Sequence, residues 1–199
     1  MKLWKMLLLV MAVSVVLAAC GDESESDPEV EEGAIDETVD EEDPGGVLDV
    51  PEEEVTLINT EGEETATATL SEGDSGVNVA IEGENLPPGE LGFHFHETGS
   101  CELPDFESAG GHYNPTDANH GFEDPEGPHA GDMENIEVAE DGTVDTETTA
   151  DMVTMQENEE NTLYTEEGTA LIIHSEADDY VSQPSGDAGE RIACGVVGE

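Results

Sequence analysis

The chain has 199 residues, enough for one domain with extra segments or for two small domains. It carries 52 acidic against 3 basic side chains, a formal charge of −49. Phosphate binding needs basic patches, so this composition excludes nucleic acid as a partner. Such a chain repels itself at low salt, whereas molar salt shortens the screening length to about 3 Å. We therefore expect adaptation to a high-salt environment.

The N-terminus has the composition of an export signal. Lys2 and Lys5 flank an apolar run, residues 6–19, that ends in small residues before Cys20. The run is too short to span a membrane comfortably as an anchor helix. Cys20 directly follows Leu-Ala-Ala, which resembles the lipobox of bacterial lipoproteins, where the signal is removed and the cysteine carries lipid. The predicted location is extracytoplasmic, with the protein anchored to the cell membrane through this lipid.

Removal of the signal leaves Arg191 as the one basic side chain against 52 acids, a formal charge of −51. Residues 20–51 contain mostly Asp, Glu, Ser, Gly and Pro, with few apolar residues. Such a composition cannot offset the entropy of ordering, so it predicts a disordered acidic tether. The predicted organisation is a signal peptide (1–19), a tether (20–51) and one folded domain (52–199).

Short β-forming segments dominate the rest of the chain. They alternate polar and apolar residues and cover residues 55–60, 65–70, 77–81, 91–97, 135–138, 143–146, 169–174 and 192–197. Asp141-Gly142 is a strong hairpin signal. Residues 152–155 are ambiguous and form either another short strand or the end of one. About eight short strands without helical periodicity predict an all-β antiparallel sandwich or barrel.

Two cysteines remain if Cys20 carries lipid. Cys101 lies in a long loop and Cys194 in the last predicted strand, in an exported protein where disulfides persist. A bridge between them would fasten the loop to the barrel and contribute a few kcal/mol. Two free thiols are the alternative, which this compartment disfavours.

The histidines are concentrated in one region. Five of the six lie between residues 94 and 129, and the sixth, His174, ends a predicted strand. Alternate residues of a strand share a face, so His94 and His96 point the same way, close enough to bind one ion. The loop that follows is rich in Gly, Pro and Asn; it cannot bury much apolar surface, and a metal would order it. A lone histidine is usually a surface or satisfied core residue, but six beside a carboxylate indicate metal binding.

The ligand types suggest two metals. Four imidazoles could form the tetragonal nitrogen site that copper favours: His94, His96, His112 and His174. A tetrahedral zinc site could be formed by His120, His129, Asp132 and one more imidazole. With six histidines available, one must serve both ions through its two ring nitrogens, and its position makes His112 the candidate.

Several motifs then match one family in order and spacing. They are GFHFHE (92–97), SAGGHYNP (108–115), HG (120–121), HAGD (129–132), LIIHSEADD (171–179) and GERIACGV (189–196). Over about residues 53–198 the chain resembles copper–zinc superoxide dismutase. The resemblance implies an eight-stranded antiparallel Greek-key β-barrel with long metal-binding and active-site loops. It also implies copper and zinc as cofactors and superoxide as substrate, dismutated to oxygen and hydrogen peroxide.

The resemblance also assigns roles to residues. It implies copper ligands at His94, His96, His112 and His174, and zinc ligands at His112, His120, His129 and Asp132. It implies that His112 is the bridging imidazolate, that Asp178 hydrogen-bonds ligands of both metals, and that Cys101 and Cys194 form the disulfide. It implies that Arg191, beside copper, holds the superoxide anion.

Composition supports this role for Arg191. It is the sole cation of the mature chain, and the alternative, a surface ion pair, would contribute only about 0–1 kcal/mol. An anion clamp explains its presence better. The segment after His174 contains no lysine, so the long-range field should repel superoxide.

Two other functions are possible from sequence alone. A dismutase-like lipoprotein could store or deliver copper or zinc without catalysis, and a cell-surface structural protein could use the barrel only to present the tether. The complete ligand set favours the enzyme. Sequence leaves open whether the protein is a monomer or a homodimer.

Overall fold

The computed structural model describes residues 52–198, so the predicted signal, tether and lipidated Cys20 lie outside the described residues. Nine strands and one short 3-10 helix make up this range: β1 (Glu52–Asn59), β2 (Glu64–Gly73), β3 (Gly76–Gly83), β4 (Gly89–Leu91), β5 (Phe93–His96), η1 (Glu107–Ala109), β6 (Ile136–Val138), β7 (Val144–Ala150), β8 (Thr169–His174) and β9 (Arg191–Val197). Within this range, no helix is long and apolar enough to cross a membrane.

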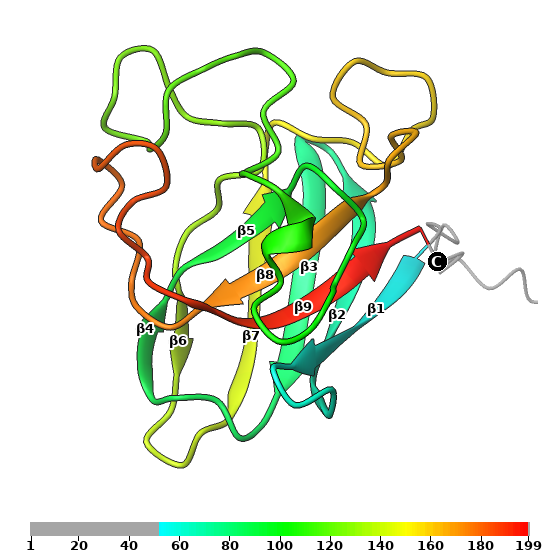
Figure 1. The fold of residues 1–199 in the computed structure, drawn as a ribbon. Helices are drawn as coiled ribbons and strands as arrows, with labels where there is room; N and C mark the ends of the chain where they lie inside the picture. Colours follow the sequence, from blue (N-terminus) through cyan, green and yellow to red (C-terminus); the bar gives the residue numbers. More distant parts are fainter. Residues whose placement is uncertain (1–51, 199) are drawn as a thin grey trace, which may run out of the picture. The chain divides into compact units, whose positions relative to one another are not determined.

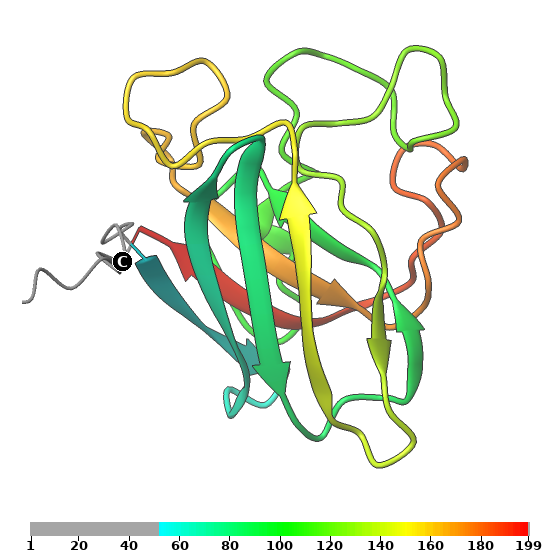
Figure 2. The same ribbon diagram turned by 180° about the vertical axis from the view of Figure 1, so that it is seen from behind.

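Seven strands form one curled antiparallel sheet, in the order β5-β8-β9-β1-β2-β3-β7, and β4 pairs with β6 in a second sheet (Figures 1 and 2). The chain runs almost directly from β4 into β5 and, through a tight turn at Asp141-Gly142, from β6 into β7. The predicted hairpin is therefore present only as a turn, because β6 pairs with β4 and β7 with β3. The small sheet therefore connects the two edge strands of the large one. This arrangement confirms the predicted all-β antiparallel Greek-key barrel.

The core follows from residue alternation. In β3, Val77, Val79 and Ile81 are fully buried, while the residues between them are partly exposed. Strand β8 differs, because all six of its residues are buried. One face of β8 points into the barrel interior, and the loop around η1 covers the other face. A strand buried on both faces is a rigid support for a site at its end.

The outer face of β8 has its own small apolar cluster. It consists of buried side chains from β8, β9 and the loop around η1, namely Phe106, Ala109, Ala170, Ile172 and Cys194. This cluster fixes the loop that follows β5 against the sheet.

Two other details differ from the sequence predictions. The expected strand 91–97 is divided at Gly92, whose N–H donates to the Glu176 carbonyl (2.8 Å) and whose carbonyl accepts from the His174 N–H (2.8 Å). Residues 152–155 form no strand; Thr154 makes only an isolated bridge with Thr162. Hydrogen bonds to the Glu72 carboxylate hold that segment, in place of the backbone hydrogen bonds of a strand pair.

Two long loops, residues 97–135 and 175–190, hold or border the histidines: the part of the first around η1 lies across β8 and β9, and its later part lies beside the second (Figures 1 and 2). The first follows β5 and the second follows β8, which are neighbouring strands. All six histidines lie in these two strands or in the first loop.

Candidate metal centre

Backbone pairing along β5 brings the first loop to the histidines. Residues His94 and Asp132 form one isolated antiparallel bridge, and His96 and His112 form another. The loop therefore doubles back beside β5. Gly131 is required for this approach, because a Cβ atom there would lie 2.4 Å from the carbonyl oxygen of Phe95.

Four buried histidines converge at the ends of β5 and β8. Their ligand atoms all lie within 4.8 Å of one another, and they are His94, His96, His112 and His174. The Nε2 atoms of His96 and His174 are 3.4 Å apart. The structure thus brings together the four residues that the sequence suggested for copper.

A second buried cluster shares His112 and centres on Asp132. Its members are His112, His120, His129 and Asp132, with ligand atoms again within 4.8 Å. Oδ1 of Asp132 lies 2.7 Å from His112 Nδ1 and 3.2 Å from His129 Nδ1, and its Oδ2 lies 3.0 Å from His120 Nδ1. These are the four residues suggested for zinc, and His112 is the member common to both clusters.

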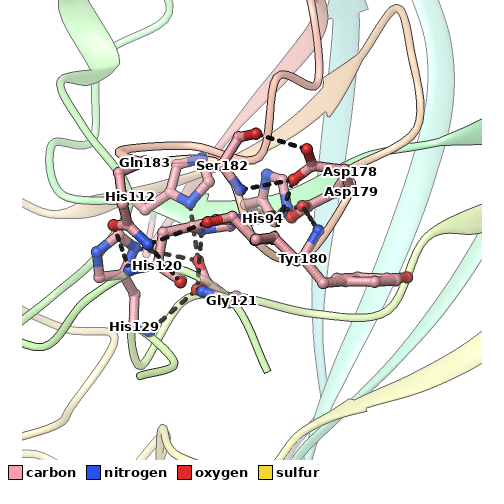
Figure 3. A network of polar contacts seen from close by, with 12 residues as sticks. His94, His112, His120, Gly121, His129, Asp178, Asp179, Tyr180, Ser182 and Gln183 are labelled. Atoms are coloured by element: carbon pink, nitrogen blue, oxygen red, sulfur yellow. Dashed lines mark hydrogen bonds and ion pairs between the residues drawn. The ribbon is translucent and has the colours of Figure 1, made fainter. Parts of the chain in front are cut away.

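Asp178 joins the two clusters from the loop after β8 (Figure 3). Its Oδ2 accepts a hydrogen bond from His94 Nε2 (2.7 Å), and its Oδ1 accepts one from His120 Nε2 (3.0 Å). Because Nε2 carries the proton in both rings, each Nδ1 presents a lone pair. The carboxylate therefore sets the orientation and tautomer of one histidine in each cluster.

Unpaired nitrogens provide a test of metal binding. Among the described residues, three buried ring nitrogens have neither a hydrogen bond nor an ion-pair contact: His94 Nδ1, His112 Nε2 and His174 Nδ1. Buried polar atoms are normally paired, so this concentration within the first cluster requires an explanation. A metal there supplies it, since neutral imidazole nitrogens are suitable ligands for copper.

Burial keeps the rings neutral. It lowers the pKa of His96 and His174 well below the ordinary imidazole value, and nearby histidines lower both further. It also lowers the pKa of His112 to about 4, although the hydrogen bond to Asp132 opposes the shift. These three rings are uncharged at pH 7 and able to coordinate.

In the second cluster, hydrogen bonds affect the pKa values more than burial does. Burial raises the pKa of Asp132, but bonds from His112 and His120 bring it well below its usual range. Burial lowers the pKa of His120, but its bonds to Asp132 and Asp178 raise it to about 9. Asp132 is therefore ionised at pH 7, and a metal ion bound between it and His120 Nδ1 would replace the proton that this ring nitrogen otherwise holds.

Arg191 lies at the entrance to the first cluster. Its guanidinium donates to the carbonyl oxygens of Phe106 (2.7 Å) and Gly110 (2.6 Å). It shares one open cavity with His96, His112 and His174. Glu97 and Asp117 line the same cavity, and burial lowers the pKa of Arg191 while Glu107, Asp105 and Glu97 act in the opposite direction.

The predicted disulfide is confirmed. Cys101 and Cys194 are bonded, with their Cα atoms 5.7 Å apart. The bridge fastens the loop around η1 to β9. That loop provides both carbonyl oxygens that hold Arg191, so the crosslink supports the guanidinium as well as the fold.

Sequence reasoning missed three residues that hold the two loops together. Oδ1 of Asn135 accepts from the Asp178 N–H (2.8 Å), and its Nδ2 donates to the Asp178 carbonyl (2.9 Å). Tyr180, at a φ of +61°, accepts the Asn135 N–H at its hydroxyl (2.8 Å). Gln183 contacts the backbone of His120. Their only signal was proximity in sequence to a candidate ligand, which does not distinguish them from other loop residues.

Comparison with known proteins gives a consistent result. Residues 64–197 match the family model described as copper/zinc superoxide dismutase. Superoxide dismutase [Cu-Zn] 1 of Aquifex aeolicus is 50% identical over 142 residues, 71% of this chain and 84% of that protein. The superoxide dismutase-like protein YojM of Bacillus subtilis is 40% identical over 197 residues, 97% of this chain and 95% of that protein.

Solved structures agree with these relatives. A crystal structure of a SOD-like protein from Bacillus subtilis superposes with a TM-score of 0.70 at 43% identity, covering 72% of this chain and 97% of that one. The Cu/Zn superoxide dismutase from Brucella abortus superposes with a TM-score of 0.62 at 28% identity, covering 74% of this chain and 99% of that one. On this evidence the chain belongs to the copper/zinc superoxide dismutase family, whose metals are copper and zinc.

Proposed function

We propose that this protein is an active superoxide dismutase, with copper in the cluster of His94, His96, His112 and His174 and zinc in the cluster around Asp132. One observation carries the proposal: two complete ligand clusters share His112, and the first opens into a cavity that also contains Arg191. A protein that only stored metal would have no need for a cation at the entrance to its copper site.

The overall reaction converts two superoxide anions and two protons to oxygen and hydrogen peroxide. Bound copper supplies the electron exchange by alternating between its two oxidation states. Arg191 binds the anion, because its guanidinium is held by two carbonyl oxygens and faces the cavity. His112 would accept a proton at Nε2 in the first half-reaction and donate it to the reduced product in the second, while water supplies the other proton of hydrogen peroxide. Asp132 keeps Nδ1 of that ring on the zinc side throughout.

The electrostatic field makes this a slow enzyme in dilute buffer. The mature chain would carry a formal charge of −51, and carboxylates line the entrance. Long-range repulsion lowers the encounter rate with superoxide until salt screens it, which leaves Arg191 and the metals as local attraction. The proposed habitat is therefore one of high salt.

The proposed location is the outer face of the cell membrane, with lipid on Cys20 as the anchor. Supporting this, the Cys101–Cys194 disulfide is a feature of oxidising, extracytoplasmic compartments.

A second candidate function is metal storage or delivery without catalysis. It is favoured by the similarity to YojM, a protein described only as superoxide dismutase-like, over 97% of this chain. The two functions differ in what they require of Arg191: catalysis needs it, whereas metal storage does not.

Substituting Arg191 tests the proposed function. We expect Arg191→Met to retain both metals and to consume superoxide about ten- to a hundredfold more slowly, because a unit charge close to the anion contributes roughly 1–3 kcal/mol. Arg191→Lys is the control, since it keeps the charge but not the paired carbonyl contacts. Its rate of superoxide consumption should lie between those of the parent protein and Arg191→Met. A rate for Arg191→Met within twofold of the parent protein would argue against the anion-binding role.

A further inference from the structure

One side chain of the loop after β8 satisfies both backbone polar groups of a zinc-cluster histidine. Oε1 of Gln183 accepts the His120 N–H (2.9 Å), and Nε2 of Gln183 donates to the His120 carbonyl (2.9 Å). The same Nε2 also lies 3.3 Å from the Val181 carbonyl. Figure 3 shows the amide lying against the main chain of His120.

The imidazole of His120 is held by the same loop. Its Nε2 donates to Asp178 Oδ1, five residues before Gln183 (3.0 Å). Residues 178–183 therefore fix the histidine at its backbone and at its ring, and Nδ1 points to Asp132 Oδ2, 3.0 Å away. Gly186 packs directly against the hydrogen bond between His120 and Asp178, because a Cβ atom at that position would overlap Asp178 Oδ1.

The other ligands of this cluster are held differently. The N–H of His129 donates to Asp132 within the same turn (3.0 Å), and His112 pairs with β5 through its neighbours. Among the described residues of the cluster, His120 is the ligand whose backbone is fastened by the loop that forms the cavity wall. Pro184 and Ser185, next to Gln183, line that cavity.

We infer that Gln183 is a positioning residue for the zinc site: its amide fixes the backbone of His120 so that Nδ1 faces the metal, and this sets zinc affinity. The inference rests on the zinc assignment of the proposed function. It does not rest on catalysis, so it is tested by metal binding alone. Contacts of this kind to a ligand typically change metal affinity by about ten- to a hundredfold.

The chain offers a matched control. Gln156 is also an exposed glutamine, and its Nε2 donates one hydrogen bond to Glu72 (3.1 Å), outside both metal clusters. Gln183→Met and Gln156→Met therefore make the same chemical change at two sites. Gln183→Asn keeps the amide but shortens the side chain by one methylene. It therefore shows whether the position of the amide matters in addition to its polarity.

The test uses the full chain with its disulfide intact. Zn²⁺ affinity is measured by competition with a chelator, Cu²⁺ affinity in parallel, and the visible spectrum is recorded with Co²⁺ in the zinc site. We expect Gln183→Met and Gln183→Asn to bind Zn²⁺ at least tenfold more weakly and to shift the Co²⁺ bands. Cu²⁺ affinity should stay within threefold, and Gln156→Met should match the parent protein.

Two results would overturn the inference. In one, the Gln183 variants bind Zn²⁺ within threefold of the parent protein. In the other, Zn²⁺ and Cu²⁺ affinities fall together, which would indicate a general loosening of the loop. If instead the parent protein binds Zn²⁺ with the expected sensitivity to Gln183 but consumes no superoxide, the proposed function fails and this inference stands.

Discussion

Asp132→Asn is expected to weaken Zn²⁺ binding by about a thousandfold. The carboxylate is buried, and it is the point at which three imidazoles and two backbone N–H groups converge. Asparagine preserves the shape and one acceptor but removes the charge. An attraction of about 4 kcal/mol per unit charge at close range, in a partly screened site, corresponds to that factor.

The measurement is a chelator competition with Zn²⁺ on the folded protein. Asp124→Asn is a suitable control, because Asp124 lies in the same loop and its Oδ1 accepts hydrogen bonds from Asn119 and Glu126 outside the cluster. That variant should bind Zn²⁺ like the parent. If Asp132→Asn bound Zn²⁺ within tenfold of the parent, the second cluster would not be the zinc site.

Loss of the disulfide should have the largest effect on stability. Cys101 and Cys194 are 93 residues apart, and closing a loop of that length constrains the unfolded chain by about 4–5 kcal/mol. We expect the double substitution Cys101→Ser and Cys194→Ala to lower the free energy of unfolding of the metal-free protein by about this amount. The decrease should slightly exceed this loop-closure value, since Cys194 also belongs to the apolar cluster on the outer face of β8.

Urea unfolding in molar NaCl measures this change, because high salt removes the general charge repulsion. The reduced parent protein provides the control: it should unfold with nearly the same free energy as the double variant. A difference of less than 1 kcal/mol between the oxidised parent and the variant would contradict the expected contribution of the crosslink.

Much of the barrel follows from the sequence because its signals are local. Alternating residues predicted the strand around Val77–Ile81, and Asp141-Gly142 predicted the turn between β6 and β7, although these two strands pair with β4 and β3 and not with each other. The division at Gly92 was not predictable, because it depends on backbone contacts with Glu176 and His174, far along the chain. Residues 152–155 contain β-forming residues but lack a partner strand.

The metal ligands could be predicted from the sequence for a different reason. Histidine is scarce, and each of the six lies in a motif with recognisable spacing, so the ligands could be named before their geometry was known. The residues that hold the ligands are common polar ones. Asn135 and Gln183 act through amide contacts across 43 and 63 residues of sequence, and nothing in their local pattern indicates the partner.

Superoxide consumption by the protein of residues 21–199, loaded with copper and zinc, is the most direct test of the account. It should be measured beside His94→Ala, in dilute buffer and in molar NaCl, with folding and metal content verified. We expect activity that rises with ionic strength at first and is abolished by His94→Ala, because the variant lacks a buried ring of the first cluster. A folded, fully metallated protein that consumes no superoxide in either buffer would contradict catalysis and support metal binding without catalysis instead.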